Sequence, residues 1–244
     1  MKAMILAAGL GTRLRPLTDK CPKALVEING RTMLEIAILR LQQAGVSEVV
    51  INAHHFREMI VEYLRSKNDF GIRVEVSLEH TLLDTGGGLN KARHFFEDGT
   101  DEPFILHNVD VLSNIDLGRM IDAHKQHQAL ATLAVQDRKT SRYLLFDDQL
   151  RLCGRRASNS EPEVIPGRQA KQALAFSGIH IISRRLLTLL KEEGAFSIID
   201  SYLRLAAEAE KIMAYRADEF YWRDLGKPES VAQATEDLRQ HLID

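Results

Sequence analysis

Short apolar runs alternate with segments of helical spacing through the first half of the chain. Runs of this kind, several rich in β-branched residues, predict strands, and apolar residues recurring every three or four positions predict helices. The expected strands are residues 3–8, 24–28, 48–52, 73–78, 104–107 and 129–135, and the expected helices are 32–44, 56–66, 89–96 and 117–127. Such alternation implies right-handed crossovers in a mostly parallel sheet. We therefore expect an α/β protein, a Rossmann-like three-layer α/β/α fold with a mostly parallel mixed sheet.

The regular alternation stops after residue 136. Two apolar runs, residues 143–146 and 150–153, flank a polar tripeptide and predict a hairpin. Residues 157–171 are polar and contain two prolines and a glycine, which predicts an exposed, mobile loop. The remaining expected elements are strands at 174–182 and 211–215 and helices at 183–192, 197–209 and 228–242.

Composition narrows the class of protein. The chain has 244 residues, of which 45% are hydrophobic and 27% charged, with a formal net charge of -2. This balance is ordinary for a globular domain and gives no reason to expect a nucleic-acid or membrane surface. The sequence shows no apolar run of bilayer length and no signal-peptide pattern. Cys21 and Cys153 do not form a metal-ligand spacing, so a reduced, cytoplasmic protein is expected.

The first strand runs into two glycines one residue apart, Gly9 and Gly11, followed by Thr12 and several cations. Glycines permit backbone angles closed to other residues, and successive amides in such a turn form an anion-binding concavity. The sequence lacks the G-x-x-x-x-G-K-[ST] pattern of a Walker loop, and Leu14 stands where a dinucleotide fingerprint needs its third glycine. The loop therefore predicts a site for several phosphates that belongs to neither class.

Other polar segments follow the expected strands directly. Asn52 ends one strand, residues 83–88 follow another, and Asn108 and Asp110 end a third. Ligands of open α/β sheets bind outside the carboxyl ends of the strands. We therefore expect these segments to meet the glycine loop. A carboxylate facing phosphates requires a cation between them, and Mg²⁺ commonly fills that role, so Asp110 is a candidate metal ligand.

The run L-A-A-G-x-G-T-R-L-x-P-L-T with Pro-Lys following resembles the sugar-1-phosphate nucleotidyltransferases, and the resemblance extends over essentially the whole chain. The strings L-D-T-G-G-G, F-S-G-I and W-x-D-L-G-x-P resemble the family's base-side loop, sugar-side strand and closing motif. These enzymes join a nucleoside triphosphate to a sugar 1-phosphate and release pyrophosphate. The resemblance implies the nucleotide-diphospho-sugar transferase fold in a single domain, 1–244. Within it we expect a nucleotide-binding half at 1–135, a sugar-phosphate-binding half at 136–227 and a C-terminal helix at 228–244.

The resemblance also implies roles for single residues. Arg13, Lys23 and Asp110 would be catalytic, and Asp110 and Asp224 would share one Mg²⁺. The nucleotide would be bound by Leu6, Ala7, Ala8, Gly9, Gly11, Thr12, Arg13, Lys23, Asn52, Asp84, Gly86, Gly87 and Asn108. The sugar phosphate would be bound by Asn108, Ser177, Gly178, Asp200 and Trp222. Val109 departs from the family pattern, which usually has glycine before the metal-binding aspartate.

Several alternatives stay open. A cation for the sugar phosphate could be Arg155, Arg156, Arg168 or Lys171, and spacing does not choose among them. The expected substrates are UTP and N-acetylmuramate 1-phosphate. Alternatives are GTP with mannose 1-phosphate, a cytidylyltransferase for phosphocholine, or a silent nucleotide-sugar-binding module. The absent third glycine disfavours an NAD-binding oxidoreductase. Histidines at the strand ends, His54, His55 and His107, lack a zinc-site spacing and are expected to be structural or peripheral. We expect a monomer or a small homo-oligomer.

Overall fold

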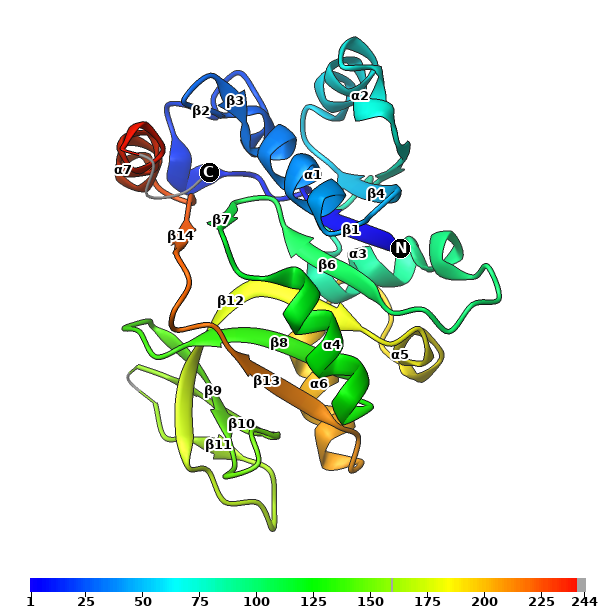
Figure 1. Cartoon of the computed structure of the whole chain (residues 1–244), viewed down its shortest axis with the longest axis vertical. Helices are drawn as coiled ribbons and strands as arrows, with labels where there is room; N and C mark the ends of the chain where they lie inside the picture. Colours follow the sequence, from blue (N-terminus) through cyan, green and yellow to red (C-terminus); the bar gives the residue numbers. More distant parts are fainter. Residues whose placement is uncertain (159, 241–244) are drawn as a thin grey trace.

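The computed structural model describes residues 1–158 and 160–240, and Figure 1 shows its arrangement. The largest sheet has 10 strands in the order β11-β10-β9-β12-β6-β1-β4-β5, with β8 joining β12 and β13 joining β8. Its strands are β1 Lys2–Leu6, β4 Glu48–Ala53, β5 Arg73–Leu78, β6 Phe104–Asn108, β8 Ala131–Gln136, β9 Arg142–Phe146, β10 Leu152–Ala157, β11 Glu163–Val164, β12 Gln172–Ile182 and β13 Ile212–Arg216. The α-helices are α1 Met33–Gln43, α2 Arg57–Ser66, α3 Asp84–Lys91, α4 Leu117–His127, α5 Arg185–Leu189, α6 Ile198–Ala207 and α7 Pro228–Arg239.

Helices cover both faces of the sheet, because neighbouring residues of a buried strand point to opposite sides. On β1, Ile5 packs into a core with α1, α2, α4 and α7, whereas Met4 packs into a second core with α3, α5 and α6. In Figure 1, α4 crosses in front of the sheet and α6 lies behind it. The expected three-layer α/β/α fold is confirmed.

The sheet is mixed. β1 pairs in parallel with β4 and β6, β4 with β5, and β8 with β13. The long strand β12 is antiparallel to β6, β8 and β9. Its register with β8 is interrupted between Phe176 and His180, and Gly178 within the interruption has a φ of 75°. β12 thus joins the parallel part of the sheet to the β9–β11 region, and its irregularity lies midway.

Two small ladders lie outside the large sheet. β2 Glu27–Ile28 pairs with β3 Arg31–Thr32 across the turn at Asn29 and Gly30, which both have positive φ. β7 Val111–Ser113 pairs with β14 Trp222–Asp224. The second ladder joins segments more than a hundred residues apart, and β14 begins the crossing to α7 seen in Figure 1.

Several predicted boundaries were wrong. The first strand ends at Leu6 rather than residue 8, and residues expected as a strand at 24–28 begin with a 3₁₀ turn, Lys23–Leu25. The helix expected at 89–96 begins at Asp84, ends at Lys91 and is followed by a 3₁₀ turn, Arg93–Phe96. The segment expected as a loop at 157–171 contains β11, which pairs with β10. The helix expected at 183–192 is only Arg185–Leu189. α7 ends at Arg239, and residues 241–244 of the expected C-terminal helix lie outside the described residues.

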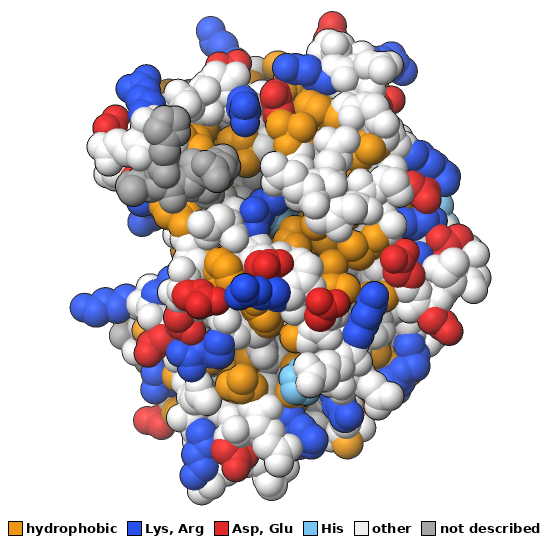
Figure 2. Space-filling model, viewed as in Figure 1, with side chains coloured by type: hydrophobic (Ala, Val, Ile, Leu, Met, Phe, Trp, Pro, Cys, Tyr) orange, Lys and Arg blue, Asp and Glu red, His pale blue; other side chains and the backbone are white. Residues whose placement is uncertain are grey.

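The surface carries both signs of charge. Figure 2 shows acidic and basic side chains interspersed over the viewed face, in keeping with the net charge of -2. None of the helices within residues 1–158 and 160–240 is long and apolar enough to cross a bilayer.

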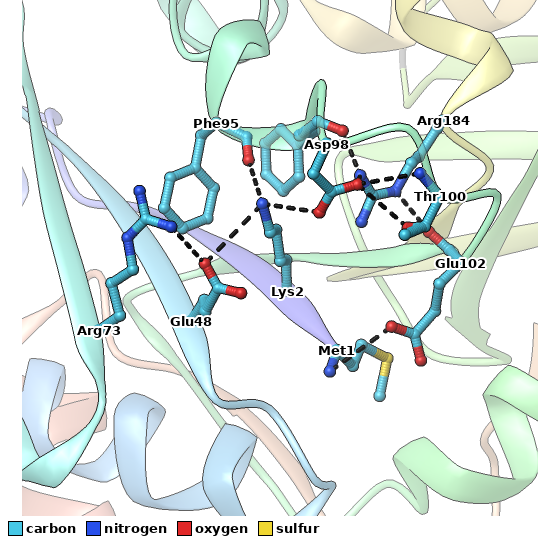
Figure 3. A network of polar contacts seen from close by, with 10 residues as sticks. Met1, Lys2, Glu48, Arg73, Phe95, Asp98, Thr100, Glu102 and Arg184 are labelled. Carbon is cyan, nitrogen blue, oxygen red and sulfur yellow. Dashed lines mark hydrogen bonds and ion pairs between the residues drawn. The ribbon is translucent and has the colours of Figure 1, made fainter.

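A buried cation holds the amino end of β1 (Figure 3). The Nζ atom of Lys2 donates to the Phe95 carbonyl at 2.7 Å and lies 2.8 Å from the carboxylate of Asp98. Arg184 also pairs with Asp98, and Lys2 is only 7% exposed. The hydrogen bond from Lys2, aided by the Thr100 amide and Arg184, holds the pKa of Asp98 well below its ordinary value of 3.8. This network ties β1 to the segment before β6 and to the start of α5.

We predict that Lys2→Met lowers the free energy of unfolding at pH 7 by about 1–2 kcal/mol, since Asp98 is partly solvated and the ion pair is screened. In the wild-type protein, Asp98 of the unfolded chain takes up a proton near its ordinary pKa, whereas Asp98 of the folded chain stays ionised. The contribution of ionised Asp98 to the stability of the folded protein is therefore fully present above pH ~4 and is lost as the pH falls below that value. Urea unfolding across pH 2–7 should show a shallower acid loss in the variant than in the wild type. Equal acid slopes would contradict the prediction, and exposed Lys20→Met serves as the control.

Candidate active site

The ends of three parallel strands lie side by side. In the sheet register Leu6 of β1 is opposite Asn52 of β4 on one side and Asn108 of β6 on the other. Each strand then leaves the sheet with a polar segment, because the carboxyl edge is where backbone turns and ligand-binding loops are placed. The predicted convergence of these three segments is confirmed.

A cavity of about 430 Å³ opens at this edge. Its volume is in the range of small-molecule sites. Predicted residues that line it are Leu6, Ala8, Gly9, Lys23, Asn52, Asp84, Asn108 and Asp110, and Glu79, Leu82, Thr85 and Val109 complete its lining. Eight residues named from the sequence therefore share one cavity, although the first and the last of them are more than a hundred residues apart in the chain.

The Asn52 side chain fixes the beginning of the glycine loop. Its Oδ1 accepts a hydrogen bond from the Ala7 amide at 2.7 Å, and its Nδ2 donates to Glu79 Oε1 at 2.7 Å. Glu79 also accepts from the Leu83 amide at 3.1 Å and is 1% exposed. Asn52 is thus a buried side chain whose hydrogen bonds set the direction in which the chain leaves β1.

Gly11 cannot be replaced without strain. Its φ is 65°, and a Cβ there would lie 2.9 Å from Thr18 Cγ2 and 3.1 Å from Lys23 Cβ. The Thr18 hydroxyl donates to the Gly11 carbonyl at 2.8 Å. The left-handed turn therefore packs the Gly11 backbone against Thr18 and Lys23, which gives a compact loop of the kind that binds phosphate.

Lys23 and Asp110 form an ion pair inside the cavity. The side chains are 12% and 14% exposed, so solvent screens this pair less than the surface pairs. An ammonium group that can meet the oxygens of either a carboxylate or a phosphate is thereby held beside the glycine loop.

The β7–β14 ladder brings Asp224 to the same region. Asp224 is opposite Val111, the residue after Asp110, and the Leu225 amide donates to the Asp110 carbonyl at 2.8 Å. Asp224 Oδ1 accepts from the Gly226 amide at 2.7 Å. A Cβ at Gly226 would lie 2.6 Å from that Oδ1 and 2.7 Å from Arg13 Nη2. Arg13, Asp110 and Asp224 are therefore neighbours, as the sequence predicted.

The two carboxylates suit a hard divalent cation. Mg²⁺ is held in nucleotide enzymes by one or two carboxylates, and phosphate oxygens and water complete its shell. The described residues contain no group of three or more His, Cys, Asp or Glu side chains able to hold a metal without such help. The donor set at Asp110 and Asp224 fits a metal that arrives with a phosphate ligand, and their role as metal ligands stays a prediction.

The histidines near the site do not form a metal cluster within the described residues. His54 Nδ1 lies 2.9 Å from the Glu79 carbonyl, and His107 Nδ1 lies 2.8 Å from the Asn108 carbonyl. Burial, with help from the positive charge of Arg40, lowers the pKa of His107 to about 4. His107 is therefore a neutral group in the core at pH 7.

The glycine triplet that was expected to approach a base instead lies within α3 and packs against protein. A Cβ at Gly86 would collide with the ring of Phe196, and one at Gly87 with the Gly194 carbonyl oxygen. Gly88 packs on the Asn52–Glu79 pair, where a Cβ would lie 2.8 Å from Asn52 Nδ2. Asp84 lines the cavity, whereas Gly86 and Gly87 are buried. Their role in nucleotide binding stays a prediction.

The predicted sugar-side residues meet at the irregularity in β12. A Cβ at Gly178 would lie 2.9 Å from Asn108 Nδ2 and 2.7 Å from Val111 Cγ2. Trp222 Nε1 donates to the Ser177 carbonyl at 2.7 Å. Asn108, Ser177, Gly178 and Trp222 therefore form one contact group at the junction of β6, β12 and β14.

Asp200, the remaining sugar-side residue, lines a different cavity of about 490 Å³. There it pairs with Arg155, which also pairs with Glu163. Arg156 lines this cavity as well, whereas Arg168 lies near Asp147, with its guanidinium 3.8 Å from that carboxylate. Phe176 lines this second cavity and immediately precedes Ser177, so the cavity adjoins the contact group around Trp222.

Sequence reasoning missed Glu79 and Arg138. Glu79 directly follows β5, so the strand-end rule applied to Asn52 would have found it. Arg138 stacks on Trp222, with its guanidinium carbon 3.6 Å from the ring centroid. No local pattern marks Arg138, because its neighbour is 84 residues away in the chain.

The chain matches the family model described as nucleotidyl transferase over residues 2–241. A probable mannose-1-phosphate guanylyltransferase of Oryza sativa is 31% identical over 93% of this chain, which spans only 62% of that relative's length. An N-acetylmuramate alpha-1-phosphate uridylyltransferase of Caulobacter vibrioides is 30% identical over 93% of both chains. A solved structure titled as a putative glucose-1-phosphate thymidylyltransferase from Bacillus anthracis superposes with a TM-score of 0.82 at 18% identity, covering 100% of this chain and 96% of that one.

We predict opposite stability effects for two matched glycine substitutions. Gly87→Ala should lower the free energy of unfolding by about 1–3 kcal/mol, because the new methyl group meets the backbone at Gly194. Gly9→Ala should leave stability almost unchanged, since no heavy atom lies within 4 Å of its Cβ position. Urea unfolding curves measure both. A Gly87→Ala protein as stable as the wild type would show that α3 is not held by this close packing.

Proposed function

The chain belongs to the nucleotidyl transferase family, and we propose that it joins a nucleoside triphosphate to a sugar 1-phosphate, giving a nucleotide sugar and pyrophosphate. The observation that carries the proposal is the meeting of the glycine loop, the Lys23–Asp110 pair and Asp224 at one edge of the sheet. Glycine-loop amides, the cations Arg13 and Lys23, and two carboxylates in one region suit phosphoryl chemistry.

In this reaction an oxygen of the sugar phosphate attacks the α-phosphorus of the nucleoside triphosphate, and the bond to the departing pyrophosphate breaks. The attacking phosphate is already ionised, so no side chain has to act as a general base. The protein has to align two anions and offset their repulsion. Loop amides at Gly9, Gly11 and Thr12 would hold the triphosphate together with Arg13. Lys23 would move from Asp110 to the α-phosphate or the incoming sugar phosphate.

Asp110 and Asp224 would hold Mg²⁺, and the bound ion would supply positive charge that stabilises the α-phosphate during transfer. The remaining charge on the two carboxylates would otherwise repel the substrate, which supports a cation between them. On the acceptor side, we propose that Asn108, Ser177, Gly178 and Trp222 contact the sugar phosphate. The sugar would extend toward the cavity that contains Asp200.

For the substrates, we propose UTP and N-acetylmuramate 1-phosphate. The support is the Caulobacter uridylyltransferase, which matches this chain over 93% of both lengths. GTP with mannose 1-phosphate is the alternative, because the rice guanylyltransferase is 31% identical although longer. A silent binding module is disfavoured because both candidate metal carboxylates are present.

A pyrophosphate-release assay tests the reaction and its substrates together. With Mg²⁺ present, UTP, GTP, CTP and dTTP are each combined with N-acetylmuramate, mannose and glucose 1-phosphates. We expect release with UTP and N-acetylmuramate 1-phosphate, and no release when either substrate is omitted. Release with GTP and mannose 1-phosphate alone would replace the substrate proposal and keep the reaction. Binding of nucleotide without release from any pair would favour a binding module.

We predict that Lys23→Ala and Asp110→Asn each reduce turnover by roughly 10²-fold or more, the scale for loss of one charge-stabilising group. Both variants should remain folded, which circular dichroism and thermal melting check. Lys20→Ala is a matched control, because Lys20 is an exposed cation of the same segment outside the cavity lining. Turnover of Lys23→Ala or Asp110→Asn within about threefold of the control would remove that residue from the proposed machinery.

A further inference from the structure

Arg138 stacks on the ring of Trp222. Its guanidinium carbon is 3.6 Å from the Trp222 ring centroid, a distance at which cation and π system are in contact. Both side chains are half-buried. The stacking therefore takes place where solvent only partly screens it, and it restricts the orientation of the indole.

The backbone around Arg138 is attached to the segment that leads into β14. Gln136, the last residue of β8, donates through Nε2 to the Ala217 carbonyl at 2.8 Å and the Phe220 carbonyl at 3.0 Å. The Ala217 amide donates to the Val135 carbonyl at 2.9 Å. The end of β8 thus fixes both ends of residues 217–220, so Arg138 and Trp222 begin from anchored positions.

Arg138 and Trp222 also bind consecutive carbonyls of β12. Arg138 Nη2 donates to the Phe176 carbonyl at 2.8 Å, and Trp222 Nε1 donates to the Ser177 carbonyl at 2.7 Å. Both carbonyls belong to the irregular stretch that ends at Gly178, whose backbone lies against Asn108. Together the two side chains clamp this stretch against the end of β6.

The guanidinium of Arg138 is held by two contacts. Its Nε atom is buried without a hydrogen-bond partner among the described residues. The stacking on Trp222 and the hydrogen bond from Nη2 to the Phe176 carbonyl therefore fix its position.

We propose that Arg138 is a positioning residue of the acceptor side. It orients Trp222 and the Phe176–Gly178 stretch for the sugar phosphate. The role rests on the proposed nucleotidyl transfer for its catalytic consequence. The orientation of Trp222 can be measured without turnover.

Trp222 is the only tryptophan of the chain, so intrinsic fluorescence reports this contact directly. We expect Arg138→Gln to move the emission to longer wavelength and to raise quenching by acrylamide, and Arg138→Lys to restore part of the change. Lys139→Gln is the matched control, because it removes the same charge from an exposed neighbouring residue. Identical spectra for Arg138→Gln and Lys139→Gln would overturn the positioning role.

In the pyrophosphate assay, Arg138→Gln should raise KM for the sugar phosphate by about tenfold and leave KM for the nucleoside triphosphate within about twofold. Equal increases in both KM values would contradict an acceptor-side role. If the wild type released no pyrophosphate with any pair, the proposed function would fail, and the fluorescence measurement would still decide whether Arg138 positions Trp222.

Discussion

The hydrogen bonds of Asn52 are the contact on which the candidate site depends. One amide side chain at the end of β4 holds the Ala7 amide at the end of β1 and the Glu79 carboxylate beyond β5. All of these groups are buried, so each would otherwise lose its hydration without replacement. Gly88 packs on the same pair, which places α3 as well. The loop that leaves β1, the segment after β5 and the first helix of the cavity wall are therefore set by one buried residue.

Charge at the site is balanced locally and not by the protein as a whole. The chain carries a formal charge of -2, yet the proposed reaction requires it to attract two phosphorylated substrates. Lys23 pairs with Asp110, and Arg13 lies near Asp224 at Gly226. Every carboxylate proposed to bind metal thus has a basic side chain near it. The bound triphosphate would draw Lys23 and Arg13 to itself and leave Asp110 and Asp224 available to a metal. Binding of nucleotide and of metal would then support each other, because each removes a repulsion that opposes the other.

The sequence predicted the elements that have enough residues to show a period. The apolar run of β1 and the amphipathic pattern of α1 are long enough to predict a strand and a helix. The rule that ligands lie at carboxyl strand ends grouped Asn52, Asn108 and Asp110 correctly. The β7–β14 ladder was not predicted, because three-residue strands show no periodicity and their partners are distant in the chain.

The start of α3 was missed for a different reason. Each glycine costs up to about 1 kcal/mol in a helix relative to alanine, so Gly86–Gly88 read as a loop. Close packing of the three glycines against Phe196, Gly194 and Asn52 outweighs their low helix propensity. These contacts exist only in the tertiary structure, so the sequence could not show them.

Val109 shows why a departure from a family pattern does not by itself disturb a site. Glycine at this position would be needed if the backbone adopted a positive φ or if a side chain collided with ligand. Val109 is not among the residues with positive φ, its amide donates to the Leu6 carbonyl at 3.1 Å, and its side chain is 4% exposed in the core shared with α1. The valine therefore faces mainly the protein interior and extends the pairing of β6 with β1 by one residue. Because the Asp110 carbonyl is in turn held by the Leu225 amide, the aspartate is fixed from both sides by backbone hydrogen bonds that any residue at position 109 could make. The orientation of Asp110 follows from the ends of β1 and β14, and the β-branched side chain before it adds packing without redirecting the carboxylate.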